Sequence, residues 1–104
     1  MRVIERNILD EASLAASTQT EILDMEHMVG VSVQVMASAG TATATLEVSN
    51  DKESWVALPN PVSISGATND MLYATDLWYK WLRVNVTVAA PVSDAKLHIT
   101  AKGM

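Results

Sequence analysis

The chain has 104 residues, a formal net charge of -5 at pH 7 and no cysteine. This length suits a single domain, and the lack of cysteine excludes both disulfide bonds and thiolate metal sites. An acidic chain with seven Lys and Arg residues is poorly suited to bind nucleic acid, because phosphate contacts need clustered cations. No run of 18 apolar residues and no signal-type apolar segment occurs, so we expect neither a membrane span nor a signal peptide.

The N-terminal segment, residues 1–18, has an irregular pattern of apolar and charged side chains. Residues 2–9 are compatible with an edge strand or an arm, and residues 10–17 begin with a capping aspartate that is compatible with a single helical turn. We therefore expect an N-terminal arm or edge strand whose aliphatic side chains contact other copies of the protein. These candidate oligomer contacts are Val3, Ile4, Ile8, Leu9 and Leu14.

The remaining residues, 19–104, are expected to form one β-sandwich domain, and its clearest feature is the stretch 29–58. Apolar residues occupy every second position in 31–37 and again in 42–48, with polar residues between them. This alternation gives each strand one buried and one solvated face. A small-residue turn at 38–40 then predicts that these strands pair directly, as the first two strands of a β-meander.

Further short strands are expected over 62–65 and 71–75, and long alternating strands over 78–88 and 95–101 with a loop at 89–94 between them. Eight or nine strands without a long helix predict an all-β, antiparallel sandwich, either jelly-roll-like or immunoglobulin-like. One parity of these strands should form a single buried cluster between two sheets. Its members are Val33, Val35, Leu46, Val48, Leu82, Val84, Val86, Leu97 and Ile99.

Residues that could support catalysis or bind a metal are few. His27 and His98 have no second ligand at a metal-binding spacing, and no serine lies in a nucleophile motif. Acidic side chains in predicted loops could in principle bind calcium, but solvated turn residues are the favoured interpretation. They are Asp51, Glu53, Asp70 and Asp76. We therefore expect no enzymatic activity, no metal and no cofactor.

The aromatic residues all lie in the second half of the chain. Trp78, Tyr79 and Trp81 are candidates for stacking on a sugar ring, although packing in a core that lacks phenylalanine is the favoured role. Arg83 shares a strand face with Trp81 and Asn85, so it has a ring to lie along. We expect its guanidinium to meet a carboxylate or a backbone carbonyl.

Four short stretches resemble small structural proteins of tailed-bacteriophage virions. Residues 46–55 match a strand that runs into "SNDG", a few polar residues and Trp, and residues 32–35 match an "S-x-Q-V" strand. Residues 64–67 match an "ISGA"-like turn and residues 79–84 a "Y-K-W-L-R-V" strand. Lys52 stands where the resembled pattern has Gly, which leaves the turn type open.

The resemblance implies a non-enzymatic virion component, such as a head decoration protein or a tail- or fibre-associated protein. Such a protein would be made in the host cytoplasm and would bind capsid or tail proteins. We also expect self-association, and the resemblance favours a trimer. The alternative is a carbohydrate-binding adhesion module that uses exposed aromatic residues.

Overall fold

A computed structural model describes residues 3–75 and 78–103, which form nine β-strands. The strands are β1 (Val3–Leu14), β2 (Thr18–Gln19), β3 (Leu23–Asp24), β4 (Met28–Ala37), β5 (Ala39–Ser49), β6 (Val56–Ala57), β7 (Val62–Ser65), β8 (Thr68–Thr75) and β9 (Trp81–Gly103). All strand pairs are antiparallel. The predicted all-β antiparallel sandwich is confirmed.

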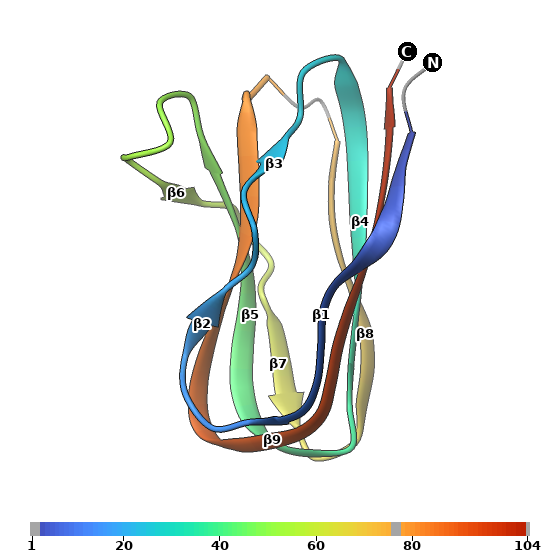
Figure 1. Ribbon diagram of the computed structural model, residues 1–104, viewed down its shortest axis with the longest axis vertical. Coiled ribbons are helices and arrows are strands. Elements are labelled where there is room, and N and C mark those ends of the chain that lie inside the picture. Colours follow the sequence, from blue (N-terminus) through green and yellow to red (C-terminus); the bar gives the residue numbers. More distant parts are fainter. Residues whose placement is uncertain (1–2, 76–77, 104) are drawn as a thin grey trace.

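Strand β9 is shared by both layers of the sandwich. Its first half pairs with β2, β3 and β5, and its second half pairs with β1 and β4. Figure 1 shows it running down one layer, turning at the lower end and running up the other. The predicted loop at 89–94 is therefore wrong: the strand continues through a bend, where Val92 is buried and Asp94 takes a φ of 54°.

The predicted β-meander is also wrong at its first turn. Strands β4 and β5 both flank β9, and the sheet order β6-β5-β9-β4-β8 places them in different layers. Residues 38–40 therefore carry the chain across the end of the sandwich and do not form a hairpin. The second part of the meander is confirmed, because β5 does pair with β6.

Gly40 makes this crossing possible. Its φ of 110° is a conformation that L side chains rarely adopt, and a Cβ at this position would lie 2.3 Å from the carbonyl oxygen of Pro91. The next nearest atom is the Cα of Val92, at 2.6 Å. The crossing thus passes directly against the bend of β9, and only a residue without a side chain fits there.

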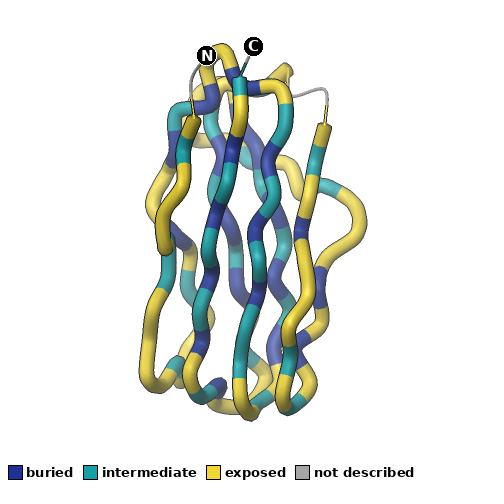
Figure 2. The backbone as a smooth tube through the Cα atoms, turned by 90° about the vertical axis from the view of Figure 1, so that its right-hand side faces the viewer, coloured by how far each residue is buried: buried dark blue, intermediate teal, exposed yellow. Residues whose placement is uncertain are grey.

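The core lies between the two layers and has the predicted parity. All nine side chains expected in one buried cluster belong to it, and Val33, Val35, Leu82, Val84 and Ile99 have no exposed surface. Figure 2 shows the same alternation of buried and intermediate residues along the central strands, with exposed residues at the edges. Thr20 fastens the chain before β3 to this core, because its backbone and hydroxyl both bond to the backbone of Val84.

The N-terminal segment forms an edge strand, β1, over most of its length, and the predicted helical turn at 10–17 is wrong. A register shift between Asn7 and Leu9 marks an irregularity in its pairing with β9. Among the candidate oligomer contacts, Val3 is 53% exposed, whereas the other four pack partly buried against the core. These four are Ile4, Ile8, Leu9 and Leu14. These four side chains thus already contact the core of their own chain, and their contact with other copies stays a prediction.

Candidate functional site

The first feature lies at the end of the sandwich that is uppermost in Figure 1, where the loop before β4 and the loop after β5 approach the start of β9 and Trp78 and Tyr79 line a depression. The structure does not bring the three candidate stacking residues onto one platform. Trp78 is 86% exposed, Tyr79 packs partly buried against the core, and Trp81 lies at the start of β9. Trp78 and Tyr79 line a shared depression with Asn50, of which Trp81 is not a part.

Strand pairing assembles a polar and aromatic cluster at the upper end of β5 and β9. Glu47 lies opposite Arg83 in the register, and the Arg83 Nε donates to Glu47 Oε1 over 2.8 Å. Both side chains are largely buried, at 16% and 17% exposure. The Arg83 guanidinium also lies 4.1 Å from the ring centroid of Trp55. The expected carboxylate partner of Arg83 is confirmed, but the ring it lies along is Trp55 and not Trp81.

The ring of Trp81 is instead contacted by two lysine side chains. The Lys52 ammonium lies 3.9 Å from its ring centroid and that of Lys80 lies 5.4 Å away. Lys52 has a φ of 66°, so the turn keeps the left-handed conformation for which glycine is favoured, although lysine occupies the position. The left-handed conformation thus costs free energy at Lys52, and the contact of the Lys52 side chain with Trp81 stabilises the turn.

The turn beneath Lys52 is held by Ser49 and Asp51. The buried Ser49 hydroxyl accepts from the backbone N–H groups of Asp51 and Lys52, and donates to Asp51 Oδ1 over 2.9 Å. The same oxygen accepts from the backbone N–H groups of Ser54 and Glu53. These bonds, that from Ser54 first, lower the pKa of Asp51 below its ordinary value. The carboxylate therefore has a structural role in this turn.

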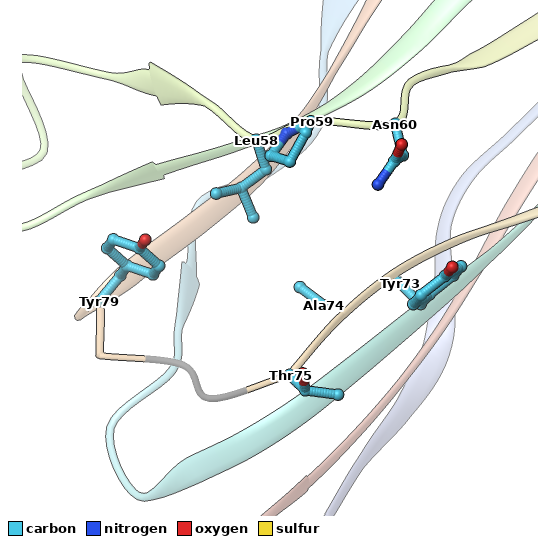
Figure 3. A pocket seen from close by; sticks show the side chains of 7 residues that line it. All are labelled: Leu58, Pro59, Asn60, Tyr73, Ala74, Thr75 and Tyr79. Atoms are coloured by element: carbon cyan, nitrogen blue, oxygen red, sulfur yellow. The ribbon is translucent and has the colours of Figure 1, made fainter.

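A second feature, the edge pocket, opens on the side of the sandwich between β8 and the link from β6 to β7. Residues 58–60 form one wall, residues 73–75 of β8 form the other, and Tyr79 lies at one end (Figure 3). Its volume is about 250 Å³. Figure 3 shows Leu58 and Asn60 reaching from one wall and Ala74 from the other, with Tyr73 at the end away from Tyr79.

The polar side chains of the edge pocket have no hydrogen-bond partner among the residues that the structure describes. They are Asn60, Tyr73, Thr75 and Tyr79. Tyr73 is 66% exposed, so its ring and hydroxyl are open to solvent. The pocket thus offers free donors and acceptors beside an apolar floor, which is a common composition for a site that binds a small polar molecule.

The described residues that were considered for metal binding do not line this pocket. Within residues 3–75 and 78–103, no group of three or more His, Cys, Asp or Glu side chains could hold a metal ion. His98 Nδ1 lies 2.8 Å from the Asn7 side-chain oxygen, and His27 Nε2 lies 3.7 Å from Glu26. Asp76 lies outside the described residues. No helix in the described part of the chain is long and apolar enough to cross a bilayer.

No known protein family and no curated protein matches this sequence. Solved structures share its fold, among them the following two. The first is the PBSX exported protein XepA, with a TM-score of 0.82, 14% identity, and coverage of 97% of this chain and 37% of the XepA chain. The second is the SPBc2 prophage-derived protein YomS, with a TM-score of 0.70, 12% identity, and coverage of 97% of this chain and 94% of the YomS chain.

These similarities establish a shared fold with phage- and prophage-derived proteins. The chain spans 37% of the length of XepA, so there the fold is one part of a longer protein. YomS is matched over nearly its whole length, so there the same fold makes up almost the whole chain. The fold therefore occurs both alone and joined to further sequence.

Sequence reasoning missed several residues of both features. Trp55 and Arg83 are 28 positions apart, and they become neighbours because β5 pairs both with β9 and with β6, which directly follows Trp55. Nor does the sequence indicate that Asn60, between Pro59 and Pro61, faces residues 73–75 across a pocket. The available signal was the asparagine itself, which tolerates a left-handed backbone and carries a side chain able to donate and accept.

Proposed function

We propose that the protein is a non-enzymatic structural component of a bacteriophage particle that acts through protein–protein assembly. The observation that carries this proposal is the fold shared with prophage-derived YomS over 97% of this chain and 94% of that one. The resemblance of residues 46–55 and 79–84 to strand and turn patterns of virion proteins points in the same direction. The partners would be other particle proteins, such as capsid or tail proteins, and further copies of the chain.

The edges of the second layer support assembly between copies. Strands β1 and β8 lie at its two sides, and each pairs with only one neighbour. An edge strand presents unpaired backbone groups that a neighbouring molecule can cover. Exposed apolar side chains accompany these edges: Val3 on β1, and Met71 and Tyr73 on β8.

Sedimentation equilibrium tests the self-association. We expect the full chain to form a homo-oligomer at micromolar concentration, and Val3→Glu and Met71→Glu to shift it towards the monomer by adding charge to the edges. Ala89→Glu, at an exposed position in the bend of β9, is the matched control and should leave the oligomer intact. A wild-type chain that is monomeric at this concentration would refute the homo-oligomer.

Electron microscopy tests the place of the protein on a particle. Antibody-coupled gold against the protein should label purified particles of the phage that encodes it at a regular position. Particles that are complete and infectious but carry neither label nor the protein would refute a structural role. A regular label on the head, the tail or a fibre would identify which part of the particle contains it.

A further inference from the structure

The residues that the structure describes around the edge pocket all have uncharged side chains. Neither wall, residues 58–60 or residues 73–75, contributes Asp, Glu, Lys, Arg or His, and Tyr79 at the end is neutral as well. The chain as a whole carries a formal charge of -5, which disfavours the approach of anions. An anionic group is therefore disfavoured at the described part of this pocket.

The lining combines two kinds of surface. Leu58, Pro59 and Ala74 provide hydrocarbon, while Asn60 and Thr75 provide hydrogen-bonding groups without partners among the described residues. The tyrosines at the two ends present rings that carry a hydroxyl. A pyranose ring also combines apolar and polar surface, because its C–H faces are apolar and its rim carries hydroxyl groups. A purely apolar ligand would leave the amide and hydroxyl groups unpaired, which costs binding energy.

The backbone at Asn60 is restricted before any ligand arrives. It lies between Pro59 and Pro61, each of which fixes its own φ, and its own φ is 66°. Its carboxamide points across the pocket towards β8 (Figure 3). The flanking prolines restrict the backbone at Asn60 and not its side chain, so binding would cost less backbone freedom here than in a flexible loop.

We propose that the edge pocket binds one neutral sugar residue of an oligosaccharide. Asn60 and Thr75 would bond to its hydroxyl groups, and Tyr73 would lie beside its ring. The volume of about 250 Å³ lies just below the usual range for drug-sized ligands, so the pocket has room for one ring, and its open side leaves space for the chain to continue. This proposal does not rest on the assembly proposed above, but both would use the edge at β8, so a sugar and a second copy of the chain would compete for Tyr73.

An NMR titration of the full-length, isotope-labelled chain tests the proposal. The probes are neutral oligosaccharides of glucose, galactose and N-acetylglucosamine, an oligosaccharide of uronic acids, and a short apolar peptide. We expect a neutral oligosaccharide to shift the amide signals of Leu58, Asn60, Ala74 and Thr75, while the uronic acid oligosaccharide and the peptide leave them in place.

Two variants define the site without removing core side chains. Asn60→Gly keeps the left-handed backbone and removes the carboxamide, and it should weaken binding about fivefold through the loss of a hydrogen bond. Tyr73→Ala removes an exposed ring and should weaken binding about three- to tenfold. Thr87→Ala, at an exposed position of β9 that is not part of the pocket, is the control and should bind as the wild type does. The dispersion of the amide signals reports that each variant is folded.

Several outcomes would overturn the proposal. They are the absence of shifts with every neutral oligosaccharide, shifts that map away from the pocket walls, and undiminished binding by folded Asn60→Gly. Preference for the apolar peptide would identify the pocket as a protein-docking site instead. Loss of sugar binding in Trp78→Ala but not in Asn60→Gly would move the sugar site to the exposed indole.

Discussion

Gly40→Ala tests whether the crossing between the two layers depends on a residue without a side chain. The new Cβ would lie 2.3 Å from the Pro91 carbonyl oxygen and 2.6 Å from the Val92 Cα, both of which are backbone atoms of β9. A backbone in this position cannot turn aside as a flexible side chain can, so the bend itself must shift. We expect a loss of about 3–5 kcal/mol in the free energy of unfolding, from left-handed strain together with overpacking.

Gly66→Ala is the matched control. Gly66 also has a positive φ, of 69°, but no atom lies within 4 Å of the position its Cβ would occupy. This variant should lose only the conformational cost, about 1–2 kcal/mol. The difference between the two variants therefore contains the collision with β9 together with the larger backbone strain at a φ of 110°.

Urea unfolding followed by tryptophan fluorescence measures both variants. The three tryptophans all lie in the second half of the chain, close to the upper end of the sandwich. For a domain whose total stability is of order 5–15 kcal/mol, the expected loss for Gly40→Ala should shift the midpoint clearly or unfold the protein. Equal losses for Gly40→Ala and Gly66→Ala would refute the argument that the bend of β9 presses on Gly40.

Three further predictions concern the upper end of the sandwich. Arg83→Met should cost about 2–3 kcal/mol because it leaves the largely buried Glu47 without its partner, and Arg83→Met combined with Glu47→Leu should recover at least half of this loss in a double-mutant cycle. Lys52→Gly should change stability by less than about 1 kcal/mol, since relief of left-handed strain offsets the lost ring contact, but it should increase acrylamide quenching of Trp81. Folding lowers the pKa of Asp51, so the stability that its carboxylate contributes to the 49–54 turn is present above the ordinary carboxyl pKa and lost as the pH falls through the lowered value. The protection of the amides of this turn against hydrogen exchange should decrease in that pH range, and Asp51→Asn should remove this decrease.

The faces of the strands could be predicted from the sequence, but their neighbours could not. Alternation with a period of two identifies which side chains turn inward, and it does so for Val33, Leu46, Leu82 and Ile99. The same pattern contains no information on which strands pair. Small residues at 38–40 are compatible both with a hairpin and with a crossing to the other layer, so the sequence alone did not reveal the crossing.

The bend of β9 was hidden for a related reason. Pro91 and Asp94 are typical of loops, and only the burial of Val92 and the continued pairing on both sides show that the strand goes on. In the candidate site, too, the expectation drawn from a single strand was correct, and a contact that depends on strand pairing was missed. The ion pair of Arg83 could be expected from its own strand, whereas its contact with Trp55 needed the register of β5 against β9.

The place of β9 as the last strand in the chain bears on how the protein is made. Strands β1 to β5 all pair with β9. In addition, β4 pairs with β8, and β5 pairs with β6 and β7. While the ribosome is still adding residues at about 5–20 per second, the apolar faces of β4 and β5 have emerged without their central partner. The sandwich can therefore close only after β9 has left the exit tunnel, and until then β4 and β5 lack the strand that joins the two layers.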